Sequence, residues 1–138
     1  GAAIRVIPSL DKSKPEELAQ FNGLFRDAHF LMMPSFESYG FAFCEASAFG
    51  LPSLCLDVGG VPVRDGFNGR LLPAGSDAVT FADVVQRYLA APDRYQALRR
   101  DTRLEYEDRL NWDAWAEKTA LLIQQAVLVK SRSGSQSG

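Results

Sequence analysis

Short, unbroken apolar runs alternate with spaced apolar positions through the first half of the chain. Unbroken runs are typical of strands that are covered on both faces of a parallel sheet. They predict strands at Ile4–Ile7, His29–Met33, Pro52–Leu56 and, more briefly, Arg70–Leu72. The spaced positions between them predict helices, so strands and helices alternate. That order indicates right-handed crossovers and a parallel sheet, which is an α/β fold.

Start and stop signals support the helices. Ser13 can cap the first helix, Pro15 is tolerated in its first turn, and Glu16 completes a capping box. The second helix should begin near Gly40 and stop at Gly50, because glycine suits the left-handed conformation that often ends a helix.

From residue 77 onward the spacing becomes helical. Three helices are predicted, with start signals at Asp77, Pro92 and Asn111. The last of them runs from Trp112 to about Val129. We interpret Trp112 and Trp115 as packing residues, because they share the apolar face of this helix.

Composition excludes several classes of protein. The 138 residues are 46% hydrophobic and 23% charged, which fits one compact domain. A net charge of −2, with acids and bases interleaved, provides no basic surface for nucleic acid. No apolar run approaches the roughly 20 residues of a membrane span, and no signal-peptide pattern is present, so we expect a cytoplasmic protein. Residues 131–138 are rich in serine and glycine and predict a disordered tail, which leaves residues 1–130 as the domain.

The residues most often used for metal binding or covalent catalysis form no pattern. Cys44 and Cys55 lack the spacing of metal ligands, and we interpret them as reduced thiols packed in the core. His29, the only histidine, is interpreted as a packed or surface residue rather than a catalyst. We therefore predict no metal site and no cofactor.

Candidate chemistry is concentrated in the stretch Phe36–Ala46. If the preceding run is a parallel strand, Glu37 lies just beyond its carboxyl end and Glu45 lies on the helix that follows. Open α/β sheets bind ligands at that edge. An ionised carboxylate can accept hydrogen bonds from both hydroxyls of a vicinal diol, as found in sugars and riboses. Gly40 and its neighbours open the helix, whose free amide groups suit a phosphate.

Several motifs in this order resemble the signature of retaining glycosyltransferases of family four, which have the GT-B fold. The resemblance spans roughly Ile4 to Val127. Its motifs are Pro34-Ser35, Glu37-x-Tyr39-Gly40, Glu45, Ala46-x-Ala48-x-Gly50-x-Pro52, Gly59-Gly60 and Asp65-Gly66-x-Asn68-Gly69-x-Leu71. In that family two Rossmann-like domains hold the substrates, and the second binds most of the nucleotide-sugar donor. The resemblance implies the donor-binding half of an enzyme that transfers a sugar from a nucleoside diphosphate sugar to a hydroxyl acceptor with retention of configuration.

The resemblance also implies roles for individual residues. Glu37 matches the catalytic-site acid that binds the hydroxyls of the donor sugar, and Glu45 matches the acid that binds the ribose. The implied donor-binding set is Glu37, Ser38, Tyr39, Gly40, Phe41 and Glu45, with Gly59 and Gly60 as a crevice loop. The donor is a substrate, so no cofactor is implied.

The chain also departs from the family pattern. Val61-Pro62 leads directly into Val63-Arg64, so the loop after Gly60 is about two residues short and lacks an acid. The family's acceptor domain, and two strand–helix units that carry an Arg and Lys pair for the diphosphate, have no counterpart here. A fragment of this kind is expected to be inactive alone.

The missing units imply a truncated Rossmann-like sheet of about three or four parallel strands, with flanking helices and a helical carboxyl-terminal part. Met32, Cys55 and Leu71 should mark three adjacent strands. The first strand, Ile4–Ile7, has lost its neighbours and should either dock beside His29–Met33 or be poorly ordered. An exposed sheet edge would favour weak self-association.

Two other functions remain open from the sequence. The chain could be a non-catalytic α/β interaction or regulatory domain in which both acids are surface residues. It could also be a sugar-nucleotide epimerase of GT-B type, although the spacing of Glu37 and Glu45 argues against that function.

Overall fold

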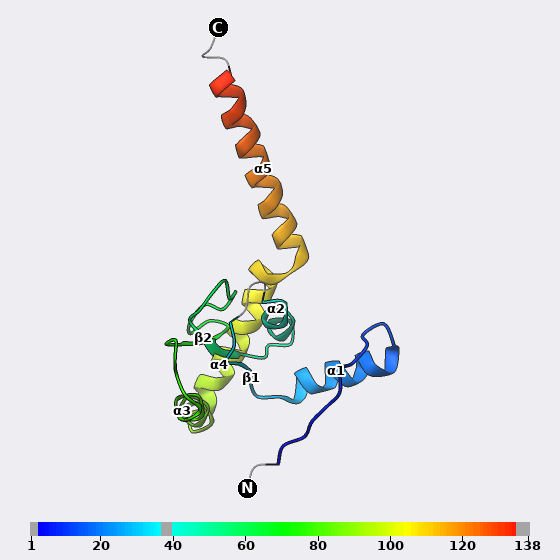
Figure 1. Cartoon of the computed structure of the whole chain (residues 1–138), viewed down its shortest axis with the longest axis vertical. Coiled ribbons are helices and arrows are strands. Elements are labelled where there is room, and N and C mark those ends of the chain that lie inside the picture. Colours follow the sequence, from blue (N-terminus) through cyan, green and yellow to red (C-terminus); the bar gives the residue numbers. More distant parts are fainter. Residues whose placement is uncertain (1–2, 37–39, 135–138) are drawn as a thin grey trace.

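The computed structural model describes residues 3–36 and 40–134. In these residues a small sheet is surrounded by helices, and one long helix projects away from it (Figure 1). The elements are α1 (Pro15–Asp27), β1 (Leu31–Met33), α2 (Phe41–Ala48), β2 (Ser53–Leu56), β3 (Gly69–Leu72), α3 (Ala78–Leu89), α4 (Pro92–Glu105), the π-helix η1 (Tyr106–Leu110) and α5 (Trp112–Gly134).

The sheet within the described residues is three-stranded, parallel and ordered β1-β2-β3. Met33 pairs with Cys55, and Cys55 pairs with Leu71. The prediction of three adjacent parallel strands, and with it the truncated Rossmann-like α/β class, is confirmed. Because the strands are parallel and adjacent, their carboxyl ends lie at one edge.

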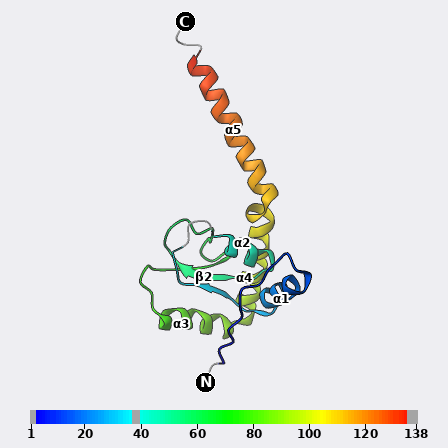
Figure 2. The same ribbon diagram turned by 45° about the vertical axis from the view of Figure 1, so that its right-hand side comes forward.

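The core lies on both faces of β2, because successive strand residues point to opposite faces. Cys55 packs with Phe43 of α2 and with Val63. Leu54 packs with Leu72 and with Phe81 of α3 on the other face. Figure 2 shows α2 and α3 on opposite sides of the strands. Fully burying a side chain such as Leu54 contributes about 1.5–3 kcal/mol, so these two layers carry much of the stability.

The first predicted strand is absent. Residues 3–10 have no regular structure, and Ile4 and Val6 are 90% and 88% exposed. Figure 1 shows this segment, in dark blue, running outside the sheet. The prediction of a strand docked beside His29–Met33 is therefore wrong. A β-forming pattern alone does not form a strand, because its hydrogen bonds must come from a partner.

Capping was predicted correctly at two helices and incorrectly at one. The Asp77 carboxylate accepts from the Thr80 amide at 2.9 Å, and the Asn111 side chain accepts from the Ala114 amide at 2.8 Å. Ser13 does not cap α1, because its hydroxyl donates instead to the Asp11 carboxylate at 2.7 Å. Lys14 occupies the cap position of α1 without a side-chain cap bond, so the predicted capping box is wrong.

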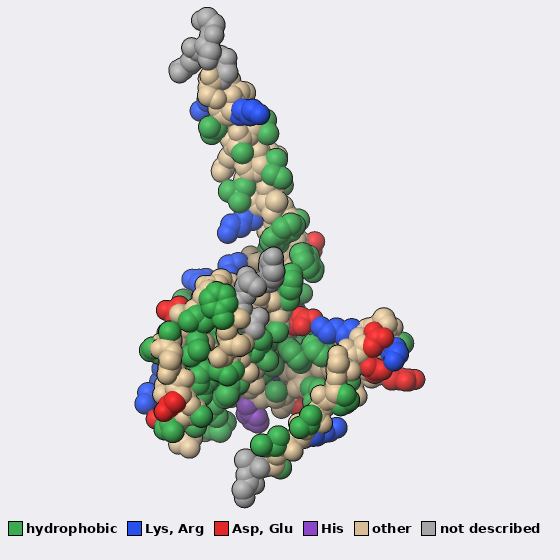
Figure 3. All heavy atoms as spheres, viewed as in Figure 1, with side chains coloured by type: hydrophobic (Ala, Val, Ile, Leu, Met, Phe, Trp, Pro, Cys, Tyr) green, Lys and Arg blue, Asp and Glu red, His purple; other side chains and the backbone are tan. Residues whose placement is uncertain are grey.

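Helix α5 differs from its prediction in packing and in length. Trp112 and Trp115 are 70% and 59% exposed, so their interpretation as packed residues is wrong. Hydrophobic side chains lie along this helix at the surface (Figure 3). The helix continues to Gly134, whereas the sequence predicts a disordered tail from Ser131 onward. Residues 135–138 lie outside the described residues.

Candidate functional site

The candidate site is built around the start of α2, next to the carboxyl end of β1. Gly40 precedes the helix with a φ of +67°, a left-handed conformation that glycine adopts without strain. It is buried against Pro62: a Cβ atom at position 40 would lie 2.4 Å from the Pro62 Cδ. Conformation and space thus both require glycine where the chain enters α2.

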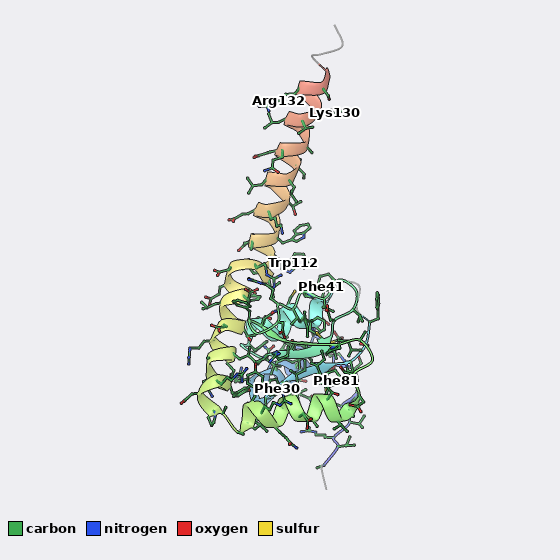
Figure 4. The ribbon with its side chains drawn as sticks, turned by 90° about the vertical axis from the view of Figure 1, so that its left-hand side faces the viewer. Phe30, Phe41, Phe81, Trp112, Lys130 and Arg132 are labelled. Carbon is green, nitrogen blue, oxygen red and sulfur yellow. The ribbon has the colours of Figure 1, made fainter. Side chains whose placement is uncertain are left out.

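Three of the predicted site residues, Glu37, Ser38 and Tyr39, lie outside the described residues. Their roles remain predictions. Phe41, the first residue of α2, is 59% exposed, and its ring lies 6.1 Å from that of Trp112, centroid to centroid. Figure 4 shows Trp112 at the base of α5, beside Phe41. An aromatic surface therefore borders the start of α2.

Glu45 lies one helical turn after Phe41. Its carboxylate forms an ion pair with the Lys12 ammonium, and the two side chains are 41% and 43% exposed. The same ammonium lies 4.1 Å from the centroid of the Phe21 ring, a cation–π contact. Lys12 comes from the segment before α1, and no sequence signal identifies it as a site neighbour, because the contact joins residues 33 positions apart.

The loop after β2 returns to the same place. Gly59 and Gly60 are exposed, and the chain then turns back so that Pro62 packs on Gly40 and Val63 enters the core beside Phe43. Pro62 of this loop thus packs against the start of α2, and the predicted crevice residues Gly59 and Gly60 come just before it in the chain. Glu45 lies further along α2, where its carboxylate meets Lys12. The grouping of these residues in one donor site remains a prediction.

The two cysteines are poor nucleophiles. Burial raises the pKa of the Cys55 thiol to about 11, and the negative charges of Asp57 and Asp65 act in the same direction. Burial also raises the pKa of Cys44, against the opposing effect of the Arg109 charge. Both groups are therefore neutral thiols near pH 7, which agrees with a packing role.

Three further features of the described residues concern metal ligands, helix hydrophobicity and surface hollows. Residues 3–36 and 40–134 contain no cluster of three or more His, Cys, Asp or Glu side chains that could hold a metal ion. None of the helices in this part is both long and apolar enough to cross a bilayer. Two open hollows, one at the junction of η1 with α5 and one between the end of α2 and α4, include neither Gly40 nor Glu45. We assign them no ligand.

Comparison with known families decides the classification. The family model described as glycosyl transferases group 1 matches residues 13–91, more than half of the chain. The chain belongs to this glycosyltransferase family. The match includes α1, the whole sheet and α2, and therefore covers the candidate site.

Curated relatives support the assignment. The chain is 37% identical over 115 residues to the D-inositol 3-phosphate glycosyltransferase of Streptomyces coelicolor, covering 81% of this chain and 24% of that protein. It is 31% identical over 128 residues to the protein of the same name from Corynebacterium efficiens, covering 91% of this chain and 29% of that one. The chain thus spans about a quarter of the length of the relatives it matches.

Solved glycosyltransferase structures share the fold. Sucrose-phosphate synthase from Thermosynechococcus elongatus matches with a TM-score of 0.63 and 30% identity, covering 76% of this chain and 27% of that one. Anabaena HepE in complex with UDP matches with a TM-score of 0.66 and 17% identity, covering 78% of this chain and 30% of that one. The sequence-based expectation of a GT-B type glycosyltransferase domain is confirmed.

Proposed function

We propose that this chain supplies the donor-binding residues of a retaining glycosyltransferase, which transfers a sugar from a nucleoside diphosphate sugar to a hydroxyl acceptor. The observation that carries this proposal is the close packing of Pro62, in the loop after β2, on Gly40 at the start of α2, the helix that carries Glu45, within a chain of this family. The fold shared with a protein bound to UDP supports a nucleotide ligand.

Each group at this edge has a chemical part in the proposal. The Glu45 carboxylate would accept hydrogen bonds from both ribose hydroxyls. The first-turn amides of α2 point outward along the helix axis, and the positive end of the helix dipole lies at the same end. Both features favour binding of the diphosphate. Gly40 allows the ligand to approach the main chain closely. Glu37 would bind the donor sugar, with Ser38, Tyr39 and Phe41 completing that side and Gly59 and Gly60 lining the other.

The ion pair at Glu45 is compatible with this role. Exposed ion pairs contribute about 0–1 kcal/mol, because water screens them and both side chains lose freedom. A hydrogen bond to a carboxylate contributes about 1.5–3 kcal/mol. Ribose hydroxyls can therefore displace the Lys12 ammonium from Glu45 at little cost. Once released, that ammonium carries a positive charge next to the proposed nucleotide.

The expected affinity of the 138-residue chain is low. Two sets of carboxylate hydrogen bonds, at Glu37 and Glu45, would contribute roughly 3–6 kcal/mol before ordering costs. A millimolar complex corresponds to about 4 kcal/mol. In a protein as long as the relatives, residues outside the matched quarter would provide the acceptor site and further donor contacts. We therefore propose donor binding for this chain and catalysis only in such a longer protein.

One observation favours a second candidate function, a non-catalytic interaction domain. Glu45 is already paired with Lys12 in the structure, as expected of a surface acid that only holds the segment before α1 against α2. Removing the carboxylate charge distinguishes the two functions. The loss should weaken nucleotide binding if Glu45 binds the ribose, and should leave it unchanged if Glu45 is only a surface acid.

The test compares UDP binding by the wild-type chain and by Glu45→Gln. We expect the variant to bind about tenfold more weakly or worse, because the amide carries no charge and has one acceptor oxygen where the carboxylate has two. Glu117→Gln, which removes an acid from α5, is the matched control and should bind like wild type. Equal affinities for all three proteins would contradict the donor role of Glu45 and favour the interaction domain.

A further inference from the structure

A buried amide at the end of the loop between β2 and β3 holds the middle of that loop. The Asn68 side chain is fully buried. Its oxygen accepts from the Arg64 amide at 2.7 Å, and its nitrogen donates to the Pro62 carbonyl at 3.2 Å. The same nitrogen lies 3.4 Å from the hydroxyl of Ser47 in α2. One side chain therefore connects the loop with the helix that it packs against.

A second anchor reaches the same carbonyl from the other side. An Nη atom of Arg109 in η1 donates to the Pro62 oxygen at 2.9 Å, while its Nε donates to the Glu105 carboxylate at 2.9 Å. The other oxygen of Glu105 accepts from Arg64 at 2.6 Å. Glu105 is only 8% exposed, so its charge is compensated by two guanidinium groups.

The Pro62 carbonyl thus receives both hydrogen bonds that its two lone pairs can accept. The ring of the same proline contacts Gly40, where an added Cβ would lie within 2.4 Å of Cδ and 3.0 Å of Cγ. A shift of Pro62 would therefore change the packing of Gly40, the residue from which α2 begins. Asn68 and Glu105 are buried and paired at both ends of this network, whereas Arg64 and Arg109 reach the surface. Paired polar groups in a low-dielectric interior favour one geometry, because an unpaired alternative is costly.

We propose that Asn68, Arg109 and Glu105 are positioning residues, which hold Pro62 against Gly40 and thereby set the first turn of α2 relative to the 59–62 loop. This inference rests on the proposed donor site for its functional meaning. None of the three belongs to the set that we propose to contact the donor. They act through Pro62 and Gly40.

The chain offers a matched control for this network at the opposite end of α2. Arg103 of α4 also pairs with a glutamate four residues away, Glu107, through its Nε at 2.8 Å. It also donates to a backbone carbonyl, that of Ala48 at the end of α2. Arg103→Met and Arg109→Met therefore remove the same kinds of bond at different ends of one helix.

The first experiment measures amide hydrogen exchange in the ligand-free chain. We expect Arg109→Met to speed exchange by about tenfold at Phe43 and Cys44, whose amides donate to the Gly40 carbonyl, and Arg103→Met to leave those two amides unchanged. Glu105→Gln keeps the shape of the network and should change the same amides in the same direction but less. Equal effects of Arg109→Met and Arg103→Met, or none at Phe43 and Cys44, would overturn the proposal.

The second experiment measures the UDP affinity of the same variants. It is done at a temperature at which thermal unfolding curves show each variant to be fully folded. Arg109→Met should weaken binding about three- to tenfold and Arg103→Met should not. If wild type fails to bind UDP, the proposed function fails, while the exchange result still decides the positioning role. If wild type binds and Arg109→Met binds equally well, the positioning role is refuted and the donor site stands.

Discussion

At the residue scale, Gly40 is the position where conformation and packing coincide. Its left-handed φ disfavours a Cβ atom, and its contact with Pro62 leaves no room for one. We predict that Gly40→Ala destabilises the chain by about 2 kcal/mol or more, measured by urea unfolding. Gly66→Ala is the control, because Gly66 has a φ of +80° but no atom within 4 Å of the added Cβ. It should cost about 1 kcal/mol. Equal costs would show that Pro62 does not constrain Gly40.

The buried thiol of Cys55 makes a prediction about pH. Its pKa in the folded chain is about 11, above the usual 9.0, so the unfolded chain loses the thiol proton first as the pH rises. The contribution of Cys55 to stability is therefore complete below pH 9 and is lost as the pH rises towards 11. The free energy of unfolding of wild type should fall in this interval more than that of Cys55→Ala. Parallel pH curves for the two proteins would contradict the raised pKa.

At the scale of elements, the sequence correctly predicted those helix starts, helix ends and strands that depend on residues close together in the chain. The apolar runs located the three strands that pair, and Asp77 located the start of α3, because a cap bonds within its own turn. At Gly50 a φ of +62° ends α2 as predicted. At Ser13 a local competitor, the Asp11 carboxylate, took the hydroxyl from the predicted cap. Competition between nearby side chains is not visible in a residue pattern.

The features that sequence patterns could not predict depend on distant partners. Ile4–Ile7 has strand composition, but residues 3–10 find no strand to pair with. The Trp face of α5 has the spacing of a packed helix, yet it is exposed. At the site, Gly40 and Glu45 were predicted from the motif. Lys12, Glu105 and Arg109 are distant from these residues in the sequence and come near them only in the folded chain. Sequence spacing carries no information about such contacts.

Helix α5 gives a prediction of its own. Beyond its start, where Trp112 meets Phe41, α5 exposes its large hydrophobic side chains from Leu121 to Val129. This part of the helix gains little from packing, which supplies most helical stability in proteins. In dilute solution we expect the amides of residues 117–133 to exchange far faster than those of Ser53–Leu56. Protection of α5 that grows with protein concentration would support the expected weak self-association. Strong protection at all concentrations would contradict an unpacked α5.

At the scale of the whole molecule, the chain provides one edge of a parallel sheet with a helix start and a loop beside it. The relatives are about four times longer than the matched region, so the proposed enzyme activity needs more residues than are present here. We propose that the 138 residues alone bind a nucleotide weakly at that edge. The family match and the packing of Pro62 on Gly40 support this proposal.

The most direct test maps that location by NMR. Amide shifts of the ¹⁵N-labelled chain would be followed while uridine, guanosine and adenosine diphosphate sugars are added to high millimolar concentration. We predict that one of them shifts the amides of Gly40 to Glu45 and of Gly59 and Gly60, with a midpoint near the millimolar range. Absence of any shift at these amides with all three donors, while α2 remains folded, would contradict the donor site.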